Sequence, residues 1–152
     1  MGIYLSYSDN NTFTNIVTND NGNEDGNGIT LYYSNFNTFV NVTSINSSDD
    51  GICVFNSHNN TFTNVTVTSS SDAANDGMIW ISNSHNNTFT NIEANNGPAT
   101  GINLSYSDYN TLTNITVTGN EYGISIYGNS DHNTIKDSNI THNSEAGLWL
   151  NE

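Results

Sequence analysis

The stretch GINLSYSDYNTLTNI, residues 101–115, carries the pattern that decides the fold. It returns as GICVFNSHNNTFTNV at residues 51–65, and its general form is G-I-x-L-x-x-S-x-x-N-T-F-T-N-I. Large apolar residues alternate in it with polar ones, which is the two-residue period of a β-strand. The apolar residues show no helical spacing anywhere in the chain. The sequence therefore predicts short strands joined by turns rich in Asn, Ser and Gly.

The pattern repeats along the whole chain, and its Asn-Thr step is an anchor for aligning the copies. Successive anchors lie 26, 23, 27, 23 and 23 residues apart, and a serine stands three residues before each of them. The anchor asparagines are Asn11, Asn37, Asn60, Asn87, Asn110 and Asn133. A repeat of about 20–50 residues is typical of a solenoid, in which each unit buries its apolar side only against its neighbours.

Alignment of the copies places the apolar residues in four columns. These are Ile3, Ile29, Ile52, Ile79, Ile102, Ile124 and Leu148; Leu5, Leu31, Val54, Ile81, Leu104, Ile126 and Leu150; Phe13, Phe39, Phe62, Phe89, Leu112 and Ile135; and Ile16, Val42, Val65, Ile92 and Ile115. Coils stacked about 4.8 Å apart turn such columns into one continuous core. We predict an all-β, right-handed parallel β-helix of about six coils of 22–27 residues, with three strands per coil. It forms one domain over residues 1–152, and we expect this domain to be a segment of a longer repeat array.

Two columns of asparagine mark the predicted corners. One consists of the anchors, and the other of Asn15, Asn41, Asn64, Asn91 and Asn114. Stacked amides can hydrogen-bond from coil to coil, so both columns are expected to form ladders. We expect Asn41, Asn64 and Asn114, which also head Asn-x-Ser/Thr sequons, to be too buried for glycosylation.

The charge of the chain excludes several partners. There are 15 acidic residues, one lysine (Lys136) and no arginine, giving a formal net charge of -14. A chain so poor in cations does not neutralise phosphates, so we expect neither nucleic-acid binding nor attraction to an anionic membrane. No apolar stretch is long enough to insert into a membrane. The lone Cys53 stands between apolar residues and is interpreted as a small strand residue.

The G-I-x-L…S-x-x-N-T-F-x-N pattern resembles the parallel β-helix repeats of NosD-like proteins, in the carbohydrate-binding and sugar-hydrolase group. It is most similar to Asn- and Thr-rich arrays in cell-surface proteins of methanogenic archaea. The resemblance covers the whole chain and implies an extracellular or cell-surface location, with a role in a surface layer or envelope. It does not specify an activity, because lyases, hydrolases, epimerases and adhesins share this repeat.

Three acidic residues are the candidate catalytic set. Asp50 and Asp76 each precede a repeat glycine in successive coils, and Asp49 lies beside the first. Glycoside hydrolases use two carboxyl groups about 5–10 Å apart, which such stacking allows. The competing interpretation is turn formation, because Asp-Gly is a favoured turn pair. Lyase chemistry is disfavoured, since it needs a basic residue near the site.

Two further groups are candidate metal ligands. The segment 20–25 places Asp20, Glu24 and Asp25 among glycines, as an oxygen-lined calcium site requires, although the spacing is not that of an EF-hand. His58 and His85 occupy the same slot in successive coils and are close enough to share a transition metal. Solvated loops and surface stacking explain the same residues, and we expect no cofactor, with calcium as the ion to test.

One outward column of the pattern is threonine, and a second lies two residues on. The array consists of Thr12, Thr14, Thr38, Thr61, Thr63, Thr88, Thr90, Thr111 and Thr113, interrupted by Val40 and Lys136. Regular ranks of Thr-x-Thr are similar to the surface of β-helical ice-binding proteins. Threonine is also a good residue for an exposed strand, so the array has a purely structural explanation.

Exposed turns and aromatic residues supply the remaining candidates. Asn10, Asn59 and Asn86 head sequons on predicted turns and are candidate glycosylation sites. The aromatic candidates for stacking on sugar rings are Tyr4, Tyr32, Trp80, Tyr106, Tyr127 and Trp149.

We expect a non-catalytic structural, adhesive or envelope domain that contacts glycans and associates end to end with other copies or further repeats. The alternatives are a polysaccharide hydrolase and an ice-binding protein.

Overall fold

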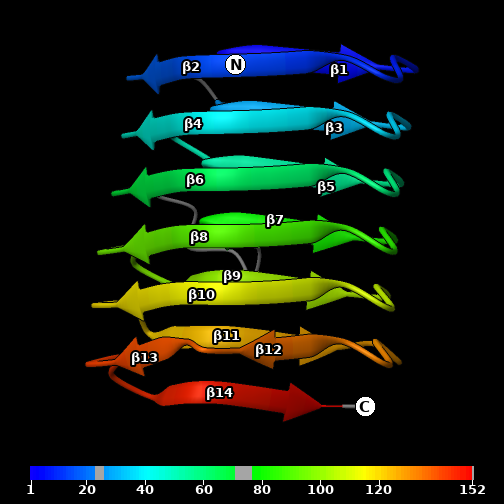
Figure 1. The fold of residues 1–152 in the computed structure, drawn as a ribbon. Coiled ribbons are helices and arrows are strands. Elements are labelled where there is room, and N and C mark those ends of the chain that lie inside the picture. Colours follow the sequence, from blue (N-terminus) through cyan, green and yellow to red (C-terminus); the bar gives the residue numbers. More distant parts are fainter. Residues whose placement is uncertain (23–25, 71–76, 152) are drawn as a thin grey trace.

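The computed structural model describes residues 1–22, 26–70 and 77–151, which form a stack of β-strand coils (Figure 1). Two parallel sheets run the length of the stack, and each strand pairs with strands one coil away. The first sheet contains β1 (Ile3–Ser6), β3 (Ile29–Tyr32), β5 (Ile52–Phe55), β7 (Ile79–Ser82), β9 (Thr100–Ser105), β11 (Tyr122–Tyr127) and β14 (Ala146–Asn151). The second contains β2 (Thr12–Asn19), β4 (Thr38–Ile45), β6 (Thr61–Thr68), β8 (Thr88–Asn95), β10 (Thr111–Thr118), β12 (Thr134–Lys136) and β13 (Asn139–Thr141).

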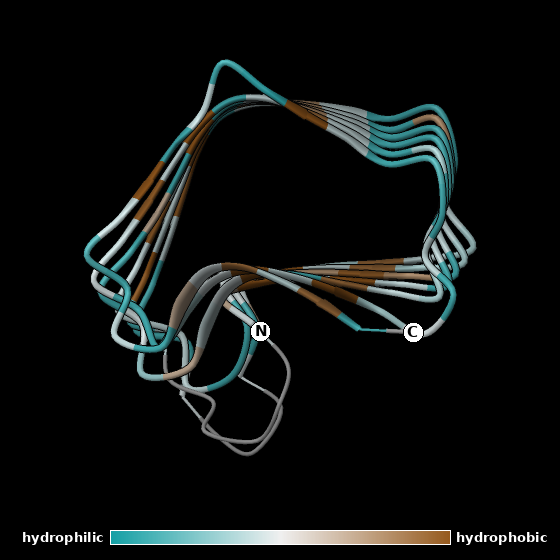
Figure 2. Cartoon of the chain, turned by 90° about the horizontal axis from the view of Figure 1, so that it is seen from below, coloured by the Kyte–Doolittle hydropathy of each residue, from teal (hydrophilic) through white to brown (hydrophobic). Residues whose placement is uncertain are grey.

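Each long strand of the second sheet bends at one asparagine. Asn15, Asn41, Asn64, Asn91 and Asn114 have φ of 54–58°, the left-handed conformation that asparagine tolerates better than most residues. In the last coil Asp137 has φ 53° and separates β12 from β13. Figure 2, seen along the stack, shows the resulting three walls around the interior. The prediction of three strand segments per coil is confirmed, with two of the segments joined into one bent strand.

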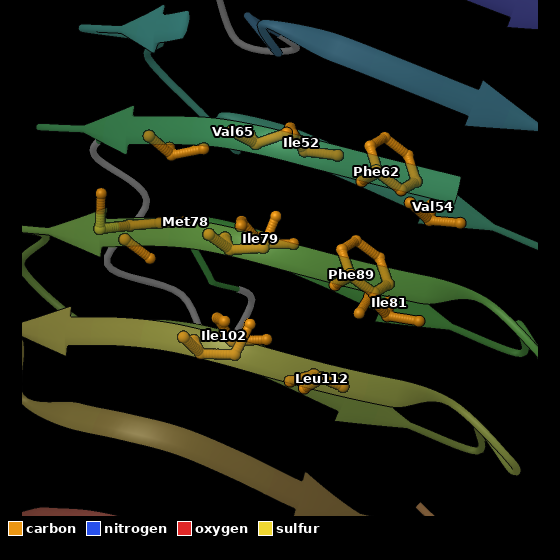
Figure 3. Close-up of a cluster of buried hydrophobic side chains, with 14 of the residues drawn as sticks. Ile52, Val54, Phe62, Val65, Met78, Ile79, Ile81, Phe89, Ile102 and Leu112 are labelled. Atoms are coloured by element: carbon orange, nitrogen blue, oxygen red, sulfur yellow. The ribbon is translucent and has the colours of Figure 1, made fainter. Parts of the chain in front are cut away.

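The four predicted apolar columns form the core. Strand register pairs Phe13 with Phe39 and Phe39 with Phe62, and the rings of Phe62 and Phe89 stack at 4.8 Å and 1°. That distance is the spacing of neighbouring strands, so each ring lies on the ring of the coil below. Figure 3 shows the buried side chains of β5–β10 pointing into the same interior. One continuous cluster results, with Phe39, Phe62 and Leu112 fully buried.

Two polar ladders satisfy the backbone where each coil leaves the first sheet. The backbone N–H of Asn60 donates to Asn87 Oδ1 (2.8 Å), and Asn87 Nδ2 donates to the Ser57 carbonyl (3.0 Å). The backbone N–H of Ser57 donates to Ser84 Oγ (3.0 Å), whose hydroxyl donates to the Ser82 carbonyl (2.7 Å). These bonds explain why Asn and Ser recur three residues apart, since a buried turn leaves no backbone group unpaired.

Within the described ranges no segment is helical, and so none is a helix able to cross a bilayer. Cys53 lies in β5 and is buried, as expected for a small strand residue.

Candidate functional site

The outer face of the first sheet carries two columns of side chains. Strand alternation turns Ile29 and Leu31 inward, and Thr30 and Tyr32 therefore face outward. Register extends these positions into the columns Tyr4, Thr30, Cys53, Trp80, Asn103, Ser125, Trp149 and Ser6, Tyr32, Phe55, Ser82, Ser105, Tyr127, Asn151. Each of the strands β1, β3, β5 and β7 thus presents one aromatic residue on this face, β9 presents only Asn103 and Ser105, and aromatic residues return in β11 and β14.

A groove lies over the strands β9, β11 and β14 of this face. Its volume is about 420 Å³, within the roughly 300–1,000 Å³ of small-ligand sites. The lining residues are Thr100, Asn103, Tyr122, Ser125, Tyr127, Trp149 and Asn151. We call this the Trp149 groove.

Three aromatic rings stand together in the Trp149 groove. The Trp149 ring lies 5.6 Å from that of Tyr122 and 6.5 Å from that of Tyr127, tilted by 39° and 46°. Trp149 is 41% exposed, whereas Asn103 and Ser125 are buried beneath it as a polar floor. Aromatic faces above hydroxyl and amide groups suit a sugar ring, whose C–H face stacks while its hydroxyls hydrogen-bond. None of the lining residues is a carboxylic acid.

The aromatic candidates divide according to this geometry. Tyr127 and Trp149 line the groove; Tyr4, Tyr32 and Trp80 lie elsewhere on the same face; and Tyr106 is exposed in the turn after β9. Sequence reasoning missed Tyr122 and Phe55. Phe55 was detectable, because it aligns with Tyr32 in the repeat, but the position of Tyr122 depends on the path of the chain into β11.

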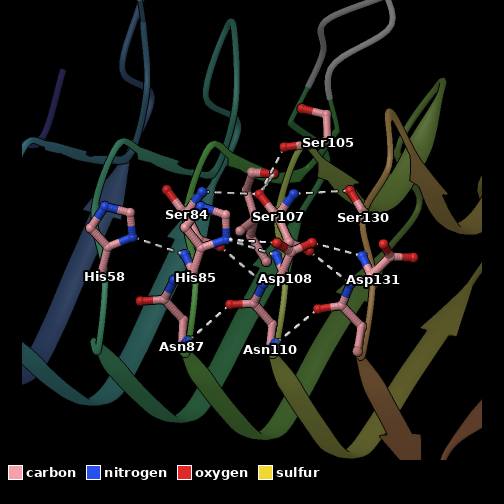
Figure 4. Close-up of polar contacts among 12 residues, drawn as sticks. His58, Ser84, His85, Asn87, Ser105, Ser107, Asp108, Asn110, Ser130 and Asp131 are labelled. Carbon is pink, nitrogen blue, oxygen red and sulfur yellow. Dashed lines mark hydrogen bonds and ion pairs between the residues drawn. The ribbon is translucent and has the colours of Figure 1, made fainter.

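A third polar ladder includes both histidine candidates (Figure 4). The rings of His58 and His85 stack at 5.1 Å and 3°. His58 Nδ1 accepts the backbone N–H of His85 (3.1 Å), and His85 Nδ1 accepts that of Asp108 (2.9 Å). Asn35 and Asp108 serve as acceptors in the same way for His58 and Asp131. Both Nδ1 atoms thus accept backbone hydrogen bonds, a role that only a ring nitrogen without a proton can fill.

The histidine pair has the features of a structural ladder. Burial, and secondarily the charge of His85, lowers the pKa of His58. Within the part of the chain that the structure describes, no three His, Cys, Asp or Glu residues group as metal ligands.

The candidate carboxylates are only partly described. Asp50 is 2% exposed and its Oδ1 accepts the backbone N–H of Gly77 (3.4 Å), while its own N–H donates to Asn27 Oδ1 (2.9 Å). Asp49 is half-buried beside it, and Asp76 lies outside the described residues. Asp20 is exposed and accepts a bond from Asn46 Nδ2 (3.2 Å). Glu24 and Asp25 also lie outside the described residues, so the proposed calcium loop stays a prediction.

The threonine ranks are in register on the outer face of the second sheet. Thr61, Thr88 and Thr111 pair coil to coil, and two residues on Thr63, Thr90 and Thr113 do the same. Thr38, in β4, and Thr12 and Thr14, in β2, continue the array toward the first coil. Val40 interrupts it in β4, beside Thr14.

The sequon asparagines differ from expectation in one respect. Asn10, Asn59 and Asn86 are exposed, each with φ near 58°. Asn41, Asn64 and Asn114 are exposed as well, so the expectation that their column is buried was wrong. Their amides do form a ladder, with Asn64 Nδ2 donating to Asn41 Oδ1 (3.0 Å). The bend that the column makes directs these side chains away from the core, because the left-handed residue sits on the convex side of the wall.

Comparison with known proteins agrees with this architecture. A search of curated proteins gives no match to the chain. The family model described as the right handed beta helix region matches residues 27–152, most of the chain. The parallel strand order, the coil-to-coil columns and this match agree, and the chain belongs to the right-handed β-helix family.

Proposed function

We propose that this protein is a non-catalytic β-helical domain that binds glycans in the Trp149 groove. The observation that carries the proposal is the position of Trp149 between Tyr122 and Tyr127, above the uncharged floor of Asn103 and Ser125. Membership of the right-handed β-helix family is consistent with a carbohydrate-related or structural role.

Hydrolysis is less well supported than binding. Glycosidases need two carboxyl groups beside the scissile bond, and the lining of the Trp149 groove includes none. Asp50, the best described acid of the catalytic hypothesis, is buried and accepts a backbone hydrogen bond in a turn.

The experiment is a microarray of uncharged and anionic oligosaccharides, followed by titration of the glycans that bind. The variant Trp149→Ser introduces the residue that Ser125 already provides in the same column, so the strand is retained. We expect this variant to lose binding by about tenfold or more, by analogy with aromatic residues that stack on nucleic-acid bases, which contribute on the order of 1–3 kcal/mol per base. The control Tyr109→Asn removes a ring that is more exposed (55% against 41% for Trp149) and lies at another corner, and this variant should bind normally. Failure of the wild-type protein to bind any glycan would refute the proposal.

We further propose an extracellular or cell-surface location, in the manner of the NosD-like arrays, and association through the ends of the solenoid. β14 has one strand neighbour in the described part of the chain and exposes Leu148 and Leu150, the latter by 64%. Such edges favour pairing with another strand. Light scattering of the wild-type protein should show a mass that rises with concentration. The Leu150→Lys variant should stay monomeric. A constant monomer mass for the wild-type protein would contradict association.

Ice binding is a second candidate, favoured by the register of the threonine ranks. Thr63, Thr90 and Thr113 lie in one line over three coils, beside the line of Thr61, Thr88 and Thr111. Thermal hysteresis should then be measurable and should be lost in Thr90→Lys. It should be kept in Thr116→Lys, because Thr116 lies beyond the bend at Asn114, in a column that already holds the charged Glu93. Absence of hysteresis in the wild-type protein would remove this candidate.

A further inference from the structure

The outer face of the first sheet carries a second aromatic group at its other end. Tyr4, Tyr7, Tyr32 and Tyr33 gather around β1 and β3, and we call them the tyrosine platform. We propose that the tyrosine platform is a second sugar-stacking site and that one extended, uncharged glycan spans it and the Trp149 groove. This inference rests on the proposed function, because it extends the same ligand along the same face.

The rings of the tyrosine platform are fixed by one another. Tyr7 and Tyr33 stack at 5.2 Å and 6°, and Tyr33 meets Tyr32 edge-on at 4.6 Å. Tyr7 is nevertheless 72% exposed, so its face is available to a ligand. Rings held in place before binding lose little conformational entropy when a ligand stacks on them.

The phenol groups of the platform lie close enough to influence one another. The pKa of Tyr32 is raised by desolvation and, to a smaller extent, by Tyr33, Tyr7 and Tyr4. Several hydroxyls beside apolar ring faces provide hydrogen-bonding groups as well as stacking surfaces, which is what a sugar requires.

The face between the two sites is aromatic over β5 and β7 and polar over β9. Tyr32 stacks on Phe55 at 5.6 Å, and Phe55 lies 6.0 Å from Trp80. Beyond Trp80 the outward positions are the small, buried residues Ser82, Asn103, Ser105 and Ser125. No large side chain in these two columns blocks a chain laid across β9. From β3 to β14 there are five strand steps, about 24 Å at roughly 4.8 Å per step.

Charge and shape indicate the class of glycan. With a formal net charge of -14 and only Lys136 as a basic side chain, the protein repels uronic-acid and sulfated chains. The aromatic residues succeed one another along the axis of the solenoid, so a straight glycan chain fits this face better than a helical glycan chain. An uncharged β-1,4-linked glucan has this shape and apolar ring faces.

Binding at two sites on one face predicts a dependence on ligand length. A glycan that reaches both sites gains affinity through effective concentration, by up to about 10²–10⁴. A short glycan occupies one site at a time and gains nothing.

The test is calorimetric titration with β-1,4-linked glucose oligosaccharides from the disaccharide to the octasaccharide. The variant carries Tyr7→Asn and Tyr33→Asn together. Both tyrosines have φ 48°, and Asn56 and Asn83 occupy the same slot in the next two coils with φ 46° and 47°, so the turns are preserved. Tyr109→Asn is the control, because Asn59 and Asn86 fill its slot.

We expect the wild-type affinity to rise by about tenfold or more between the trisaccharide and the octasaccharide. The double variant should lose this gain while the trisaccharide affinity of its Trp149 groove is unchanged, and the control should keep the gain. No gain with length, or a gain that survives in the double variant, overturns this inference. The proposed function survives that outcome if Trp149→Ser still lowers the trisaccharide affinity by about tenfold or more. If octagalacturonate binds as tightly as the glucan octasaccharide, the assignment to uncharged glycans is wrong. If no oligosaccharide binds, this inference fails together with glycan binding in the Trp149 groove.

Discussion

His58 Nδ1 accepts the backbone N–H of His85 at 3.1 Å, and the two rings stack in parallel. The imidazole thus stabilises the turn of the next coil only while its Nδ1 is unprotonated. The same position in the preceding coil is filled by Asn35, whose Oδ1 accepts the backbone N–H of His58 at 2.8 Å and does not titrate in this range.

This contact predicts a loss of stability in mild acid. Because burial lowers the pKa of His58 below its ordinary 6.5, the unfolded chain binds more protons than the folded one as the pH falls. The contribution of His58 to stability is complete above about pH 6.5 and declines as the pH falls through the lowered pKa. His58→Asn keeps an acceptor and should flatten this dependence in urea titrations at a series of pH values. Equal pH slopes for the two proteins would show that His58 is not responsible.

The phenylalanine column predicts a position-dependent loss on truncation. Phe62→Ala leaves a cavity between Phe39 and Phe89 and should reduce the free energy of unfolding by about 3–5 kcal/mol. Phe13→Ala should cost less, because Phe13 is only half-buried and has one stacked neighbour. Urea unfolding checks both variants, and equal losses would mean that the rings do not act as one stacked core.

The anchor ladder predicts a large effect for a polar residue. Asn87→Ala removes the acceptor of the Asn60 N–H and the donor to the Ser57 carbonyl. We expect a loss of about 2–4 kcal/mol, since each buried group left unpaired costs roughly 1–3 kcal/mol.

Asn91→Gly is the control for the anchor ladder, because it removes two exposed side-chain hydrogen bonds, to Asn64 and from Asn114, and keeps the left-handed φ of 56°. Its loss should be about 1 kcal/mol or less. If Asn91→Gly were as destabilising as Asn87→Ala, burial would not be the cause.

The repeat glycines predict a steric effect. A methyl group at Gly51 would overlap Val67 Cγ1 of the core, whereas none of the residues that the structure describes lies within 4 Å of a methyl group at Gly22. Gly51→Ala should therefore lower the thermal midpoint by several degrees, and Gly22→Ala should leave it almost unchanged. Calorimetry of both variants tests the contrast, which disappears if the glycines serve only chain flexibility.

The sequence by itself determined the coils, their register and the inward residues. The alignment of Ile29 with Ile52 and of Phe62 with Phe89 depends only on a two-residue strand period and a repeat, because equivalent residues of parallel coils must stack. The anchor ladder followed from the same rule.

The tertiary structure alone decided which side chains are accessible and which meet across different slots. The Tyr122 ring joins Trp149 although the repeat does not align them, Asp50 is buried in a turn, and Asn64 is exposed in its ladder. A repeat specifies which residues lie above one another, but exposure and contact between columns depend on how sharply the walls bend and which large rings lie alongside. Those quantities are set by packing of the whole stack and are absent from the alignment of its units.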